Sequence, residues 1–114
     1  MKFTLKKAQQ FSWEGLKGWA FNSKEEFSNA SASYFEVTAN HGRVLSAVSD
    51  RVYYVLEGEG NFTINSEIIS VSATDVVIVP KNTPYDYRAS EGSTLKLFLV
   101  HTPAYDEAKE EKLD

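Results

Sequence analysis

The chain has 114 residues and a formal net charge of −4, and it contains no cysteine. This length fits one compact domain with a single hydrophobic core rather than two domains. The lack of thiols excludes a disulfide framework, a thiolate metal site and a cysteine nucleophile. No basic stripe is present to neutralise a phosphate backbone, so the composition argues against nucleic-acid binding.

The N-terminal third carries lysines and scattered aromatic residues. Residues 1–11 contain three lysines but no apolar run behind them. A signal peptide or a membrane anchor requires such a run, so we expect a cytoplasmic protein without a membrane partner. The aromatic residues of segment 1–33 follow no regular period, and we expect this segment to lie across the main domain or to add edge strands to it.

Between Ser33 and Pro103, β-branched and aromatic residues form short runs separated by Gly, Asn, Ser and Pro. Such runs are typical of β-strands. The predicted strands are 34–39, 44–48, 52–56, 60–65, 68–71, 75–79, 85–89 and 95–102. Strands this short and closely spaced leave no room for helical crossovers, so they must pair antiparallel. The sequence therefore predicts an all-β sandwich or barrel.

Turn residues support this division of the chain. Gly58 and Gly60 can take the positive φ of a hairpin turn, and Pro80 and Pro84 bracket a loop because proline cannot donate into a central ladder. The segment from Ala104 onward is acidic and rich in helix formers, which predicts a helical or disordered tail. We thus expect an N-terminal segment (1–33), a barrel core (34–103) and an acidic tail (104–114) in one domain.

Two stretches of the core resemble the two sequence motifs of cupins. The first, 42–60, runs from a glycine turn through Tyr-Tyr-Val-Leu to a closing Glu-Gly-Glu-Gly turn. The second, 75–85, begins with an acidic turn residue and continues as a strand that ends in proline. One alternating hairpin joins them. The resemblance covers 34–103 and implies a small single-domain cupin, an antiparallel double-sheet jelly-roll β-barrel.

The likeness to cupins fails at the metal ligands. The positions at which metal-binding cupins carry His, His, Glu and His fall here on Leu45, Ala47, Arg51 and Tyr85. Two of these side chains have no donor atom, one is a permanent cation, and the phenol would have to ionise. His41 and His101 lie far apart in the sequence, and two imidazoles do not make a site. The expectation is therefore that the protein holds no metal and needs no cofactor.

Strand alternation indicates which side chains line the barrel. Side chains alternate between the two faces of a strand. If the positions of the missing metal ligands face inward, the inward residues are Leu45, Ala47, Arg51, Tyr53 and Val55. Tyr87 then lies inward beside Tyr85. Tyr34 and Glu36 share one face of an earlier strand, although the pattern does not fix which. A buried guanidinium needs a partner, and Glu36 is the first candidate for it.

Three functions fit this interior. The first is metal-independent binding of a sugar-like or anionic small molecule inside the barrel; its binding residues would be Arg51, Tyr53, Tyr85, Tyr87, Tyr34 and Glu36. The second is a metal-free sugar isomerase or epimerase, with Tyr85, Tyr87 or His101 as acid and base. The third is a catalytically silent cupin that acts as an interaction module, in which the tyrosines are core residues and Arg51 reaches solvent.

The last predicted strand has two apolar faces. Phe98 and Val100 alternate with Leu97 and Leu99, so both sides of the strand need cover. The resemblance to small cupins, which commonly dimerise through their sheets, implies a homodimer.

Overall fold

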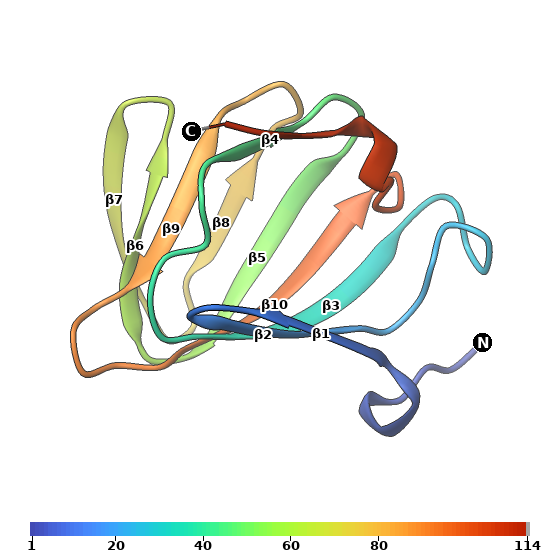
Figure 1. The fold of residues 1–114 in the computed structure, drawn as a ribbon, viewed down its shortest axis with the longest axis horizontal. Helices are drawn as coiled ribbons and strands as arrows, with labels where there is room; N and C mark the ends of the chain where they lie inside the picture. The colour runs from blue at the N-terminus through green and yellow to red at the C-terminus, as the bar shows by residue number, and fades with distance from the viewer. Residues whose placement is uncertain (114) are drawn as a thin grey trace.

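The computed structural model describes residues 1–113 and shows two antiparallel β-sheets that face each other (Figure 1). One sheet has six strands in the order β1-β2-β3-β10-β5-β8, and the other has five in the order β11-β4-β9-β6-β7. Neighbours in each sheet are mostly distant in sequence, as in a jelly roll. The predicted all-β jelly-roll fold is confirmed. None of the described residues belongs to a helix long and apolar enough to cross a membrane.

The strand bounds agree with the sequence prediction to within a few residues. The six-stranded sheet consists of β1 (Gln9–Trp13), β2 (Leu16–Ala20), β3 (Ser31–Val37), β10 (Leu95–Thr102), β5 (Asp50–Glu57) and β8 (Val76–Val79). The five-stranded sheet consists of β11 (Glu110–Lys112), β4 (Val44–Ser46), β9 (Tyr85–Ala89), β6 (Glu59–Ile64) and β7 (Glu67–Ser72). Two single turns of 3-10 helix, η1 (Leu5–Lys7) and η2 (Glu107–Lys109), precede β1 and β11.

The N-terminal segment forms a hairpin at the edge of the six-stranded sheet. β1 pairs with β2, and β2 pairs with β3. Gly15 permits the tight turn because its φ is +82°, and a side chain there would collide with Ala39. Phe11 of β1 packs edge-on against Phe35 of β3. Of the two arrangements expected for this segment, the added edge strands are the one observed.

The acidic tail is more ordered than the sequence indicates. After β10 the chain makes the turn η2 and then the strand β11, which pairs with β4 across one end of the barrel (Figure 1). Asp106 caps η2 by accepting a hydrogen bond from the backbone N–H of Ala108. A three-residue strand has too little alternation to be recognised in sequence, which is why the prediction gave only a helical or disordered tail.

The side chains that face the barrel interior are apolar at one end of the strands and polar at the other. At one end of the barrel Leu95, Leu97 and Val55 are fully buried among other apolar groups. At the other end Arg51 of β5 faces His101 of β10 in register. The barrel therefore has an apolar end and a polar end, and the polar end offers the groups that could bind a ligand.

The sequence prediction for β4 was wrong by one residue. Val44 and Ser46 are the buried positions of this strand, whereas Leu45 is only half-buried and Ala47 is exposed. The chain bends after β4, where the Ser46 hydroxyl accepts a hydrogen bond from the backbone N–H of Ser49 at 2.9 Å. Because the bend breaks the period of two, the inward phase of β5 cannot be extended back to β4. Leu45 and Ala47 therefore do not line the barrel interior, contrary to the prediction.

Candidate functional site

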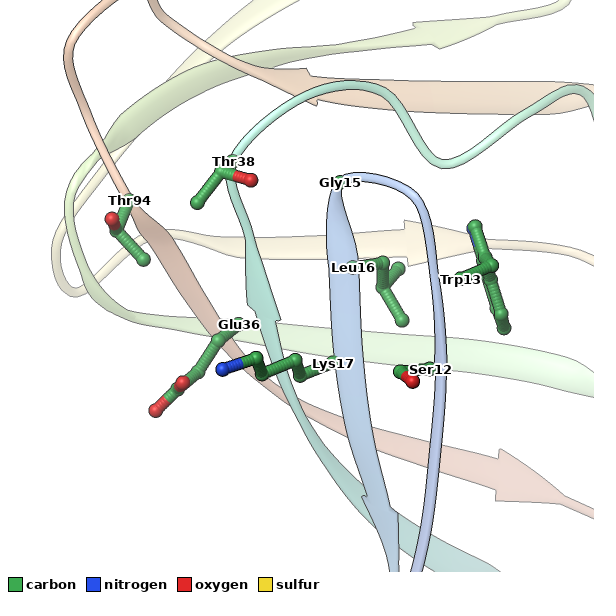
Figure 2. A pocket seen from close by; sticks show the side chains of 8 residues that line it. All are labelled: Ser12, Trp13, Gly15, Leu16, Lys17, Glu36, Thr38 and Thr94. Atoms are coloured by element: carbon green, nitrogen blue, oxygen red, sulfur yellow. The ribbon is translucent and has the colours of Figure 1, made fainter.

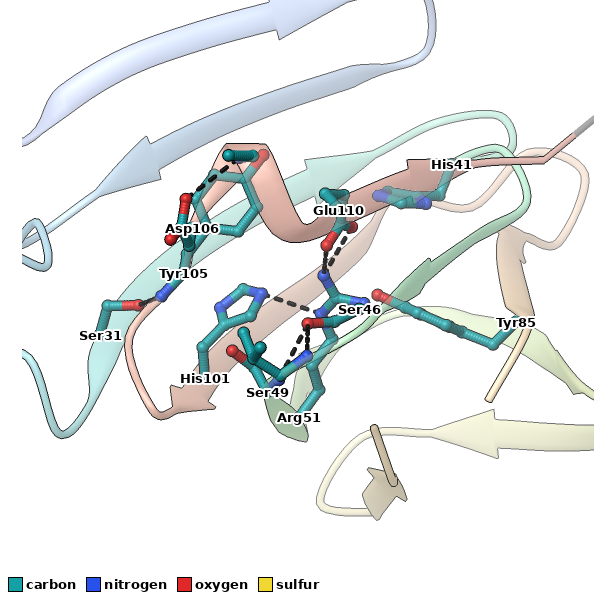
Figure 3. A network of polar contacts seen from close by, with 12 residues as sticks. Ser31, His41, Ser46, Ser49, Arg51, Tyr85, His101, Tyr105, Asp106 and Glu110 are labelled. Atoms are coloured by element: carbon teal, nitrogen blue, oxygen red, sulfur yellow. Dashed lines mark hydrogen bonds and ion pairs between the residues drawn. The ribbon is translucent and has the colours of Figure 1, made fainter. Parts of the chain in front are cut away.

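Arg51 is the centre of a buried polar network (Figure 3). It faces inward near the start of β5, as predicted, and only 2% of the residue is exposed. Its Nη2 donates to both carboxylate oxygens of Glu110, at 2.6 Å for Oε1. Its guanidinium carbon lies 5.1 Å from the centre of the Tyr85 ring. The charge is thus paired with a carboxylate and rests on an aromatic face.

His101 completes the arginine's surroundings. The Nε of Arg51 donates to the Nε2 of His101 at 2.8 Å, so this ring nitrogen must be unprotonated and the proton must sit on Nδ1. Burial, with the nearby Arg51 charge, lowers the pKa of His101 to about 3. Its Nδ1 is buried without a hydrogen-bond partner among the described residues. His101 is therefore a neutral imidazole near pH 7.

The carboxylate partner of Arg51 is not the one predicted. Glu36 accepts a hydrogen bond from the Tyr34 hydroxyl at 2.9 Å, and both side chains lie on the outer face of β3. The buried residues of this strand are Ser31, Ser33, Phe35 and Val37, so Tyr34 and Glu36 point away from the barrel interior. Burial and the Glu36 carboxylate raise the pKa of Tyr34 to about 12. Neither residue can bind a ligand inside the barrel.

Three tyrosines line the interior beside this network. Tyr53 and Tyr85 join their hydroxyl groups at 2.6 Å, and the Tyr87 hydroxyl is buried without a hydrogen-bond partner among the described residues. All three side chains are at most 2% exposed. Burial raises the pKa of each phenol well above its ordinary value. The interior thus holds three protonated phenols, and the hydroxyl of Tyr87 is available to donate a hydrogen bond to a ligand.

His41 lies against the same tyrosines. Its ring stacks on that of Tyr87 with centroids 4.6 Å apart, and Trp13 of the N-terminal hairpin meets it edge-on at 5.6 Å. The Nδ1 of His41 lies 2.8 Å from the carbonyl oxygen of Gly42, which can only accept, so Nδ1 carries the proton. Burial lowers the pKa of His41. Its Nε2 therefore offers a lone pair near pH 7, which is what a general base needs.

Sequence reasoning missed two members of this site. His41 precedes a glycine in a turn, and that position gave no reason to place it on the tyrosines. Glu110 lies in the acidic tail, where its neighbours are also charged and no pattern separates it from them. Its alternation with exposed Glu111 becomes visible only when β11 is paired with β4.

Two surface hollows lie apart from this network. The larger, of about 340 Å³, is bounded by the β1–β2 hairpin and the end of β3, and Figure 2 shows the eight residues that line it. The smaller, of about 140 Å³, lies over β6 and β9. Neither is lined by Arg51, His41 or His101, although Tyr87 lines the smaller one. The candidate site is therefore the cluster of buried polar and aromatic side chains at the polar end of the barrel.

The side chains at the polar end do not suit a metal ion. A guanidinium holds the centre of the network and would repel a cation. Within residues 1–113, no three His, Cys, Asp or Glu side chains are grouped so that they could hold a metal. The residues present therefore do not fit the metal that many cupins carry, and the groups they offer to a ligand are imidazoles, phenols and an ion pair.

Comparison with known proteins identifies the family. Residues 42–101 match the cupin domain family, so the chain belongs to the cupins. An uncharacterised protein of Methanocaldococcus jannaschii is 30% identical over 66 residues, which are 58% of this chain. That match spans 53%, about half, of the relative's own length.

Solved structures give a more specific likeness. Pac13 of Streptomyces, described as a unique nucleoside dehydratase, superimposes with a TM-score of 0.88 and 27% identity, covering 99% of this chain and 90% of Pac13. Three Pac13 variants with uridine, in which a histidine is replaced by glutamine or a tyrosine by phenylalanine, match equally well at 26% identity. The polyketide cyclase RemF of Streptomyces resistomycificus shares the fold alone, with a TM-score of 0.80 and 11% identity over 100% of this chain and 85% of RemF.

Proposed function

We propose that this protein binds a nucleoside within its barrel and removes water from it. The observation that carries the proposal is that the ring of His41 stacks on the ring of Tyr87. The Nε2 of His41 is unprotonated, and the buried hydroxyl of Tyr87 has no hydrogen-bond partner among the described residues. A histidine and tyrosines are also the residue types substituted in the uridine-bound Pac13 structures. A nucleoside is a sugar-like ligand, in keeping with the first function considered from the sequence.

Dehydration needs a base and a proton donor. The Nε2 of His41 takes a proton from a sugar carbon, the neighbouring hydroxyl group leaves, and Tyr87 supplies the proton that converts it to water. Return of the proton from the His41 imidazolium to Tyr87 restores both side chains, so substrate and product differ by one water. The carbon must be made acidic by a neighbouring carbonyl or similar group. Uridine itself therefore serves as a probe of binding rather than as the substrate.

The paired Tyr53 and Tyr85 hydroxyls suit the recognition of a sugar. Each phenol can donate one hydrogen bond and accept another, and together they present both functions next to Tyr87. A ribose carries several hydroxyl groups with the same double capacity. Buried aromatic rings add contact area with little conformational freedom to lose.

Calorimetric titration with uridine tests the binding step. We expect wild-type protein and Tyr54→Phe to bind uridine equally, because Tyr54 lies on the outer face of β5. Tyr87→Phe should bind several-fold more weakly because it loses one hydrogen bond to the sugar. Wild-type protein that binds neither uridine nor any other common nucleoside, or a Tyr87→Phe variant that binds like wild type, contradicts the proposal.

Mass spectrometry tests the reaction. Uridine oxidised to a carbonyl on its ribose should lose one water with wild-type protein and with Tyr54→Phe. His41→Gln keeps a hydrogen-bonding side chain but has no basic nitrogen, so it should bind the compound and release no product. Turnover by His41→Gln at the wild-type rate would remove His41 from the role of base.

A further inference from the structure

Among the described residues, the buried cation Arg51 is paired with the carboxylate of Glu110. The side chain of Arg51 is 3% exposed and that of Glu110 is 13% exposed, and the two are joined through both carboxylate oxygens. Arg51 also contacts the imidazole of His101 and the ring of Tyr85, both of which are uncharged. The cluster therefore carries no net charge.

Glu110 is held in this position by its strand. β11 pairs with β4 so that Glu110 lies opposite Ser46 and Glu111 opposite Leu45. The backbone is fixed on both sides of it, because the N–H of Ala47 donates to the carbonyl of Lys109 at 2.9 Å and the N–H of Leu113 donates to that of Arg43 at 2.7 Å. Alternation then directs Glu110 towards Arg51 and leaves Glu111 exposed.

The start of the tail strengthens the same attachment. The ring of Tyr105 meets that of His101 edge-on at 5.2 Å, and the backbone N–H of Tyr105 donates to the Ser31 hydroxyl at 2.9 Å. Figure 3 shows both side chains reaching the network from the tail, Tyr105 beside His101 and Glu110 beside Arg51. The carboxylate is thus a fixed part of the barrel's polar end.

A charged ligand would meet this carboxylate. A phosphate placed near Tyr85 would be attracted by Arg51 and repelled by Glu110, and it would lose its hydration shell without gaining a free cation. An uncharged sugar meets no such penalty. We propose that Glu110 is a specificity-determining residue, which by neutralising Arg51 makes the barrel select an uncharged nucleoside over its phosphorylated form. This inference rests on the proposed function for the identity of the ligand.

The test compares uridine with uridine 5′-monophosphate in calorimetric titrations. Wild-type protein should prefer uridine. Glu110→Gln, which frees the Arg51 charge, should shift the ratio of the two dissociation constants by about tenfold or more towards the phosphate. Glu111→Gln removes the same charge from the exposed face of β11 and should leave the ratio unchanged. An unchanged ratio in Glu110→Gln overturns the proposal.

A double variant separates charge from shape. Arg51→Gln/Glu110→Gln has no buried charge, so its preference should return to that of wild-type protein. A double variant that still favours the phosphate would show that removal of Glu110 acts by opening space, and this result also overturns the proposal.

Inorganic phosphate gives a readout that does not depend on nucleosides. Glu110→Gln should gain a saturable rise in melting temperature with phosphate, relative to chloride at equal ionic strength, and wild-type protein should not. A Glu110→Gln chain that is unfolded in chloride should fold in phosphate, and failure to do so contradicts the proposal. If wild-type protein binds no nucleoside but the phosphate response appears, the proposed function fails, whereas the neutralisation of Arg51 by Glu110, which excludes anions, stands.

Discussion

The two ends of the barrel interior are built from the same strands but hold different kinds of side chain. On β10 the inward residues run from Leu95 and Leu97 at one end to His101 at the other, and on β5 they run from Val55 to Arg51. The apolar end is stabilised by removing hydrocarbon from water, which tolerates many residues of similar size. The polar end depends on specific partners, because each buried donor or charge that loses its partner is costly. Changes at the apolar end should therefore alter stability alone, whereas changes at the polar end should alter function as well as stability.

The largest loss of stability is expected at the polar end, from removal of the Arg51 partner. Glu110→Ala leaves a buried guanidinium unpaired and should lower the free energy of unfolding by about 3–5 kcal/mol in urea denaturation. Replacing both partners with apolar residues, as in Arg51→Met/Glu110→Leu, should recover most of this loss. A Glu110→Ala variant as stable as wild-type protein would show that Arg51 does not depend on Glu110 as its partner.

At the apolar end the expected loss comes from a cavity. Leu97 is fully buried, and Leu97→Ala should lower the free energy of unfolding by about 2–5 kcal/mol. Phe98→Ala, on the outer face of the same strand, should cost less because that side chain is only half-buried. The ratio of affinities for uridine and its monophosphate should not change in the folded Leu97→Ala protein. A shift of that ratio would show that the two ends are coupled.

The buried histidines of the polar end predict a dependence on pH. The pKa of His101 is about 3 in the folded protein and 6.5 when the ring is unperturbed. Between these values the unfolded chain binds a proton that the folded chain does not, so the free energy of unfolding should rise with pH over this interval. His101 contributes up to about 1.4 kcal/mol per pH unit, and His41, whose pKa is also lowered, acts in the same direction.

Urea denaturation between pH 5 and 6.5 measures this slope where ordinary carboxylates are already ionised. His101→Gln keeps an acceptor for Arg51 and should show a shallower slope than wild-type protein. Equal slopes in the two proteins would mean that folding does not lower the pKa of His101.

A smaller effect of opposite sign is expected at Tyr87. Its buried hydroxyl has no hydrogen-bond partner among the described residues, so Tyr87→Phe should leave stability unchanged or raise it by about 1 kcal/mol. Tyr85→Phe, which removes a paired hydroxyl, is the matched control and should lower stability. Thermal denaturation in the absence of ligand distinguishes them. A loss at Tyr87 equal to that at Tyr85 would indicate that its hydroxyl is satisfied in the free protein.

The smallest effect on the stability of the barrel is expected from substitutions on the outer face of the six-stranded sheet. Val76 and Ile78 of the edge strand β8 are 58% and 61% exposed, and Tyr54 and Leu56 of β5 lie on the same face. We propose that a second copy of the chain covers this face. Light scattering should give the mass of a dimer for wild-type protein and of a monomer for Ile78→Lys. A monomeric mass for wild-type protein at micromolar concentration contradicts this proposal.

Much of the fold could be predicted because its signals are local. Alternating apolar residues, turn glycines and bracketing prolines mark the strands from β3 to β10, and the inward phase of Arg51, Tyr53, Tyr85 and Tyr87 follows from a period of two within one strand. The phase failed at β4, where a bend that depends on the Ser46 hydroxyl interrupts the period. The period of two also did not determine on which face of β3 Glu36 lies. The pairing of β3 with β10 determines it.

The sequence by itself determined that the chain forms short antiparallel strands, that it is cupin-like, and that an arginine and tyrosines stand where many cupins have metal ligands. Tertiary structure alone decided which carboxylate neutralises Arg51 and which histidine reaches the tyrosines. The physical reason is separation along the chain. Glu110 lies 59 residues from Arg51, and no period or propensity relates positions that only the folding of the whole barrel brings together.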